Sequence, residues 1–205
     1  MSALRAAVPG LPVGVTTGAW AVQDPSERPR VINGWSVLPD FASVNWHEAG
    51  ADEVAAALIA RGIGVEAGLW HTEAVRAWAD SRYRDQCCRV LIELPDGLDD
   101  AQTVSQADEL LAQVDLLAQV DAVANRVPVL LHGEGSSCWP ALHHAVSLEL
   151  QVRIGLEDTL QLPDGSPARD NTSLVAAARA IIRDHSNTPF PTIASARRKP
   201  CDSPS

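Results

Sequence analysis

The sequence predicts an α/β protein whose strands form a parallel sheet covered by helices on both faces. Six short runs of β-forming residues alternate with segments whose hydrophobic residues recur at helical spacing. Such strands form either an open doubly wound sheet or a barrel. Polar residues stand at the carboxyl end of almost every run, and no G-x-G-x-x-G follows the first one. Because barrel enzymes build their sites from many strand ends, this pattern favours a (β/α) barrel.

The predicted strands and helices follow each other along the chain with short connections. The strands are expected at residues 12–18, 41–46, 64–70, 88–94, 127–133 and 151–156. The helices are expected at residues 25–36, 51–62, 71–81, 99–123, 139–149 and 172–185. Asn171 to Ser173 are the expected cap of the last helix, and Asp164 and Gly165 form a turn. A complete barrel of this kind has eight strands, so the pattern predicts an incomplete one.

Residues 1–186 are expected to form one domain, and the Pro- and Ser-rich residues 187–205 are predicted to be a disordered tail. The net charge of -10 argues against a nucleic-acid partner, because such proteins need a basic face. No apolar run approaches the roughly 18 residues of a membrane span, and no signal peptide is recognised. The thiols Cys87, Cys88, Cys138 and Cys201 include no C-x-x-C pair, which favours reduced cysteines and a cytoplasmic location.

The segment "QVRIGLEDTLQLPDG" (151–165) carries the densest set of charged candidates, because Arg153, Glu157 and Asp158 stand at the exit of a predicted strand. One interpretation is structural: Arg153 and Glu157 form an ion pair, and Asp158 caps the next turn. The other interpretation is chemical: one carboxylate holds a metal, and the second works with the arginine on a substrate. The residues alone leave both interpretations open.

Several segments, in this order, resemble the β-keto acid cleavage enzymes, whose best-known member is the 3-keto-5-aminohexanoate cleavage enzyme. The resemblance runs from about Ala3 to Arg183. It is carried by "PVGVTTGAW", "PDFASVNWHEAGADEVAAALIARGIGVEAGLW", "RVLIE", "LLHG…WPAL" and "RIGLEDTLQLPDGSPARDNTSLVAAA".

This resemblance implies a (β/α)8 TIM barrel that catalyses a zinc-assisted retro-Claisen acyl exchange. In that reaction a β-keto acid and the co-substrate acetyl-CoA give acetoacetate and a new acyl-CoA. Glu157 matches the family's late zinc ligand, and Asp158 with Arg153 matches its catalytic proton-transfer pair. Thr16, Thr17, Ser43 and Glu66 are similar to substrate-binding positions. The resemblance also implies a homo-oligomer in the full-length form.

The chain departs from the family at its beginning, where the first two βα units have no counterpart. The family's remaining zinc ligands come from an H-x-H motif, which is not found among the six histidines. These are His47, His71, His132, His143, His144 and His185. The zinc site is therefore expected to be incomplete in this chain. A truncated gene model is favoured over a split gene or a decayed remnant. A catalytically inactive fragment or interaction module, and a metal-dependent aldolase-type lyase acting without acetyl-CoA, are the alternative functions.

Two further strand-end residues, Glu93 and His132, could face a pocket. A structural hydrogen bond is the favoured role for His132. His143 and His144 are adjacent on a predicted helix, where neighbouring side chains diverge by about 100° and cannot share a metal. The "GEGSS" stretch (133–137) is a weaker candidate for a phosphate contact at the start of the following helix.

Overall fold

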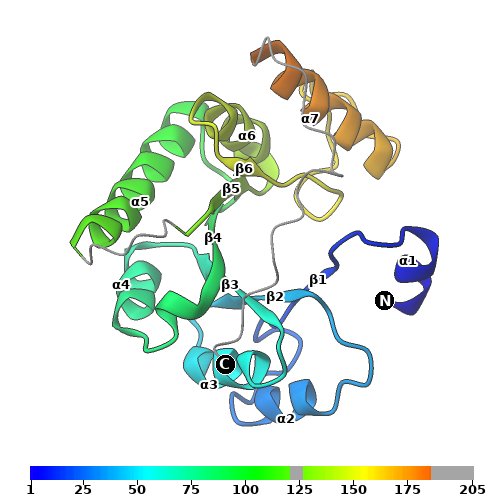
Figure 1. Ribbon diagram of the computed structural model, residues 1–205. Coiled ribbons are helices and arrows are strands. Elements are labelled where there is room, and N and C mark those ends of the chain that lie inside the picture. Colours follow the sequence, from blue (N-terminus) through cyan, green and yellow to red (C-terminus); the bar gives the residue numbers. More distant parts are fainter. Residues whose placement is uncertain (121–126, 186–205) are drawn as a thin grey trace. The chain divides into compact units, whose positions relative to one another are not determined.

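The computed structural model describes residues 1–120 and 127–185 of the chain (Figure 1). The chain divides into two compact units. Unit 1 comprises Met1–Leu91 with Leu117–Val127, and unit 2 comprises Ile92–Leu116 with Pro128–Ser205. The strands are hydrogen-bonded in the order β1-β2-β3-β4-β5-β6, which is their order along the chain.

Unit 1 contains three complete strands and the start of a fourth. The strands are β1 (Gly14–Thr16), β2 (Phe41–Asn45), β3 (Gly64–Leu69) and the first part of β4 (Cys87–Leu94). β1 pairs with β2 and β2 pairs with β3, both in parallel, and the register places Ser43 opposite Glu66. The helices are α1 (Ser2–Ala7), α2 (Glu27–Asn33), α3 (Ala51–Ile59), α4 (Thr72–Asp80) and the short η1 (Arg84–Gln86).

The core of unit 1 forms because α3 and α4 each present one apolar stripe to the strands. Val54 and Leu58 of α3 are 0% exposed, and α3 packs against β2 and β3. The strands contribute Ala42 and Val44 from β2, each buried at the alternate positions of the pleat. Burying such side chains stabilises the fold by about 1.5–3 kcal/mol for each large aliphatic residue.

Unit 2 contains the end of β4 and the remaining elements. These are α5 (Asp100–Val120), β5 (Val129–Gly133), the short η2 (Gly135–Ser137), α6 (Cys138–Ser147), β6 (Gln151–Val152) and α7 (Asn171–His185). β5 and β6 pair in parallel, and α6 packs against β5, β6 and α7 (Figure 1). Leu142, Val146 and Ala178 form the buried centre of the α6–α7 contact, with Val152 and Ile181 against it.

The described strands and helices confirm the predicted α/β fold class, with parallel strands that follow one another in sequence order as in a (β/α) barrel. The last predicted strand, 151–156, is shorter than expected, because β6 ends at Val152 and a turn begins. The last helix starts at Asn171, and its cap is Asp170, whose Oδ1 accepts a hydrogen bond from Ser173 N. The predicted tail lies outside the described residues.

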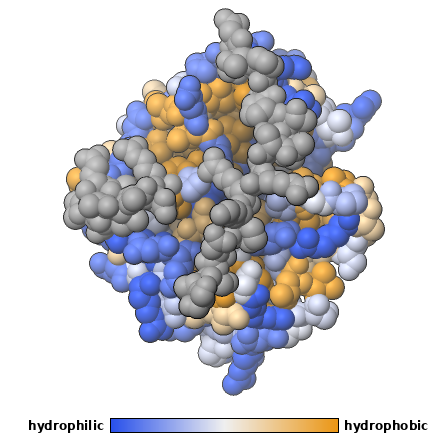
Figure 2. Space-filling view, in the orientation of Figure 1, coloured by the Kyte–Doolittle hydropathy of each residue, from blue (hydrophilic) through white to orange (hydrophobic). Residues whose placement is uncertain are grey.

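Within the described part of the chain, no helix combines the length and the hydrophobicity needed to cross a membrane. Several large hydrophobic side chains are nevertheless exposed, and Figure 2 shows hydrophobic patches among hydrophilic surface on its visible face. In unit 2 these exposed residues are Leu116, Leu148, Leu156, Leu160 and Val175.

Candidate active site

The turn that follows β6 carries Arg153, Glu157 and Asp158 and is fixed at several points. Its backbone closes where Gly155 O accepts hydrogen bonds from Asp158 N and Thr159 N, at 2.9 and 3.1 Å. The Asp158 carbonyl accepts a hydrogen bond from Gly135 N at 2.8 Å, which ties the turn to the start of η2. These contacts direct Asp158 inward and leave Glu157 outside.

Arg153 contacts both carboxylates of this turn. Its Nη2 lies 2.8 Å from Oε2 of Glu157 and 2.8 Å from Oδ1 of Asp158. The Glu157 side chain is 74% exposed and that of Asp158 is 1% exposed, with Arg153 between them at 30%. The ion pair expected from the structural interpretation is therefore present, but Arg153 also holds a buried carboxylate.

The buried position of Asp158 changes its acidity. Burial raises the pKa of Asp158 above its ordinary value, and the charges of Arg153 and His132 only partly offset this effect. A carboxyl group with a raised pKa and an arginine beside it is suited to accept and return a proton.

A second carboxylate lies on the other side of His132. His132, in β5, is 1% exposed, and its Nδ1 is 3.6 Å from Asp158 Oδ1. Its Nε2 is 3.4 Å from Oε2 of Glu93, which ends β4 and is 7% exposed. Burial raises the pKa of Glu93, but the interactions with His132 and Arg153 outweigh burial and leave the pKa below its ordinary value. Glu134 shows the opposite shift, because burial and the neighbouring Glu93 carboxylate raise its pKa.

Unit 1 holds the other predicted site residues in a chain of hydrogen bonds across three strands. Thr17 Oγ1 donates to Ser43 O at 2.7 Å, and Ser43 Oγ donates to Glu66 Oε1 at 2.5 Å. Glu66 is 4% exposed and forms a salt bridge with Arg89 of β4. Thr16 is exposed at the end of β1, where its Oγ1 accepts a hydrogen bond from Gly18 N at 3.3 Å.

The structure thus brings together Thr17, Ser43 and Glu66 in unit 1, and separately Arg153, Glu157 and Asp158 in unit 2. Sequence reasoning gave little weight to Glu93 and His132, which lie beside Asp158. In the sequence, the feature that marked these two residues as site candidates was their position at the ends of predicted strands. A register of parallel strands is needed to bring such residues together, and single-sequence patterns do not supply it.

The described residues by themselves do not fit a zinc ion. Among residues 1–120 and 127–185, no three His, Cys, Asp or Glu side chains are arranged to hold a metal. His143 and His144 lie on α6 as expected, and His144 Nε2 pairs with Asp108 Oδ1 at 2.7 Å. Zinc sites need at least three protein ligands in fixed geometry, and the exposed Glu157 could supply one.

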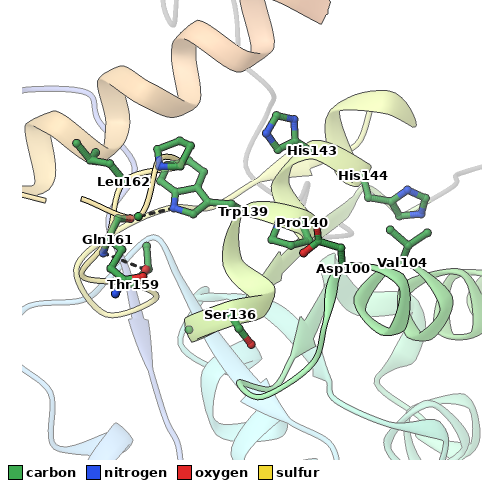
Figure 3. Close-up of a pocket in the computed structure, with 13 residues that line it drawn as sticks. Asp100, Val104, Ser136, Trp139, Pro140, His143, His144, Thr159, Gln161 and Leu162 are labelled. Atoms are coloured by element: carbon green, nitrogen blue, oxygen red, sulfur yellow. Dashed lines mark hydrogen bonds between the residues drawn. The ribbon is translucent and has the colours of Figure 1, made fainter. Parts of the chain in front are cut away.

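A cavity of about 640 Å³ lies in unit 2 between α6, the start of α5 and the 159–165 loop (Figure 3). Trp139 forms one wall, and its Nε1 donates a 2.9 Å hydrogen bond to Gln161 O, drawn as a dashed line in Figure 3. Gly135 and Ser136 of the "GEGSS" stretch line another side. Thr159, at the end of the turn that carries Asp158, also lines the cavity.

In a comparison with protein families, the model described as beta-keto acid cleavage enzyme matches residues 1–199. A comparison with curated proteins finds no match.

Proposed function

The chain belongs to the beta-keto acid cleavage enzyme family, and from that premise we propose that it exchanges acyl groups between a β-keto acid and acetyl-CoA. The observation that carries the proposal is the buried Asp158 held by Arg153 at the exit of β6. A base is needed at this reaction's first step, and Asp158 combines a raised pKa with a cation that aims it.

The proposed reaction balances without any further reactant. Asp158 removes a proton from C2 of the β-keto acid, and the resulting carbanion attacks the carbonyl carbon of acetyl-CoA, so that the CoA thiolate leaves. The thiolate then attacks the C3 ketone of the original acid, and the C2–C3 bond breaks. The products are a new acyl-CoA and the acetoacetate carbanion, which recovers the proton from Asp158.

Arg153 has two roles in this proposal. Its charge favours the ionised form of Asp158 and so partly offsets the rise in pKa that burial causes. Its planar guanidinium can also bind the carboxylate of the keto acid. Because the Asp158 side chain is 1% exposed, the proposal requires the turn from Gly155 to Thr159 to shift when substrate binds.

In unit 1, the proposed substrate contacts are Thr16, Thr17, Ser43 and Glu66. The hydroxyl groups orient substrate by hydrogen bonds without adding charge. Ser43 already donates its proton to Glu66, so its oxygen is left to accept a hydrogen bond from the substrate. Thr16 is exposed and its hydroxyl can donate outward.

We also propose that Glu157 is one of the ligands of a zinc ion. A divalent cation there would stabilise negative charge developing on the ketone oxygen. This part is tested by measuring the zinc content of the protein purified from its own cells, in the Glu157→Gln variant and in the control variant Glu149→Gln. Glu149 is an exposed glutamate near β6. Loss of zinc only in Glu157→Gln is expected, and equal zinc in both variants would contradict it.

The homo-oligomer implied by the family remains part of the proposal. The exposed Leu148, Leu156, Leu160 and Val175 support it, because large apolar side chains at a surface favour contact with a partner. Light scattering after size exclusion would show a mass above 21.8 kDa per particle for an oligomer of this chain.

The test of the reaction is product analysis with acetyl-CoA labelled by ¹³C in both acetyl carbons. We expect both labelled carbons in C3 and C4 of acetoacetate, together with an unlabelled acyl-CoA whose acyl group comes from the keto acid. Keto acid consumption that does not depend on acetyl-CoA would indicate an aldolase-type lyase and overturn the acyl exchange. No consumption of any β-keto acid by the protein from its own cells would indicate a non-catalytic protein.

A further inference from the structure

His132 lies inside unit 2 with a different carboxylate facing each of its ring nitrogens. Nδ1 is 3.6 Å from Asp158 Oδ1, and Nε2 is 3.4 Å from Glu93 Oε2. The ring is 1% exposed, and the Asp158 and Glu93 side chains are 1% and 9% exposed. Water therefore has little access to any of the three groups.

Neither ring nitrogen of His132, and neither carboxylate oxygen of Asp158, has a hydrogen bond of normal geometry among the described residues. Buried polar groups in folded proteins are nearly always hydrogen-bonded, and the exceptions often have a catalytic role. Hydrogen bonds in active sites are often long before substrate binds and shorten in the complex. A shift of a few tenths of an ångström would bring Nδ1 within hydrogen-bond distance of Asp158.

Glu93 is placed to orient the ring, because its Oε2 lies 3.4 Å from Nε2. A histidine that donates one N–H to a carboxylate is held in its plane and presents its other nitrogen in a defined direction. Here the second nitrogen points to Asp158, and a ring protonated on both nitrogens donates to both carboxylates. Arg153 contacts the same Oδ1 atom of Asp158 from the solvent side.

We propose that His132 is a positioning residue that, held by Glu93, fixes the direction of the Asp158 carboxylate for proton transfer. This inference rests on the proposed role of Asp158 as the base. With Arg153 as its one donor, the Asp158 carboxylate could rotate about the Arg153–Asp158 contact. Donation from His132, on the buried side of the carboxylate, would restrict that rotation. Misplacement of a reacting group by about 1 Å can cost on the order of 100-fold in rate.

Two amide variants separate positioning from packing. In His132→Asn the amide nitrogen takes the place of Nδ1 and can donate to Asp158. In His132→Gln the amide lies at the place of Nε2 and reaches Glu93 instead. Both variants remove the ring and introduce the same amide, so loss of packing affects both, and thermal unfolding of each checks that they fold.

With His132→Leu as the reference for loss of both contacts, we expect kcat to fall by about 10–100-fold with KM within about twofold of the wild type. His132→Asn should recover most of that loss, and His132→Gln should recover little. Equal kcat in the Asn and Gln variants would overturn the inference, as would a loss confined to KM.

A second measurement does not depend on turnover. In protein labelled with ¹⁵N-histidine, the ring signals of His132 are assigned by their disappearance in His132→Asn. Asp158→Asn should shift the Nδ1 signal, whereas Asp108→Asn should shift only His144. If the ring signals of His132 are the same in Asp158→Asn as in the wild type, and the wild type consumes a β-keto acid, the inference about His132 fails while the proposed function stands. If the signal shifts but no β-keto acid is consumed, the proposed function fails and the His132–Asp158 contact stands.

Discussion

Arg153 and Asp158 form an ion pair in which Nη2 and Oδ1 are 2.8 Å apart, although the first side chain is 30% exposed and the second 1%. The pair connects a surface cation to a buried carboxylate, and the same Nη2 atom also contacts Glu157. Removing one partner of a buried pair leaves the other uncompensated, which makes this contact a sensitive point for both stability and chemistry.

Replacement of Arg153 by Lys should lower kcat by about 10–100-fold, because a single ammonium group cannot hold two carboxylates in the geometry of a planar guanidinium. Steady-state kinetics with a β-keto acid and acetyl-CoA measures the change. Arg169→Lys is the matched control, since Arg169 is 89% exposed and pairs with its neighbour Asp170. Comparable losses in the two variants would argue against a special role for Arg153.

The free energy of unfolding of unit 2 should depend on pH through the ionisation of Glu93. Its pKa is below the ordinary value of 4.5 in the folded state, so ionised Glu93 stabilises the fold. That contribution is complete above the unfolded-state pKa and is lost as pH falls through the folded-state pKa. Denaturant unfolding between pH 7 and pH 3 should therefore show a steeper loss of stability in the wild type than in Glu93→Gln. Parallel curves would show that Glu93 makes no such contribution.

Two buried thiols should resist modification in the native protein. Burial raises the pKa of Cys87 and that of Cys138, each to about 12. At pH 8 only about one molecule in 10⁴ then carries a thiolate at either position, and the thiolate is the reactive form. Mass spectrometry after iodoacetamide treatment should find both unmodified until a denaturant is added. Rapid native labelling of Cys138 would contradict the packing of α6 against β5.

Glu66 should be important for the stability of unit 1, because it accepts from Ser43 and pairs with Arg89 while only 4% exposed. Glu66→Gln keeps the shape but removes the charge that compensates Arg89. We expect a loss of about 1–3 kcal/mol in unfolding free energy. Glu53→Gln, at an exposed position of α3, is the control and should change stability by less than about 0.5 kcal/mol.

Sequence patterns predicted the fold class because the hydrophobic spacing of each helix and strand is local. The buried positions of β2, Ala42 and Val44, alternate as a strand pattern requires, and α3 begins and ends within a few residues of the expected bounds. The predicted end of the last strand, residue 156, was wrong. The turn at Gly155 is set by hydrogen bonds from Asp158 N and Thr159 N to Gly155 O, and a hydrophobic pattern does not indicate such bonds.

The candidate site was predicted in part, and for a similar reason. Arg153 and Glu157 are four residues apart, so their pairing follows from local geometry. The contact of Asp158 with His132, and of His132 with Glu93, joins three segments distant in sequence. Such contacts depend on the pairing of strands and on the depth of each residue, which a single sequence does not fix.

The measurement that tests the central claim most directly compares acetoacetate formation by the wild type and by Asp158→Asn over a panel of β-keto acids with acetyl-CoA. The account predicts labelled acetoacetate from at least one β-keto acid in the wild type, and a decrease in kcat of about 10²–10⁴-fold in Asp158→Asn, which keeps the shape of the side chain but removes the base. Equal activity in the two proteins would contradict the role of Asp158.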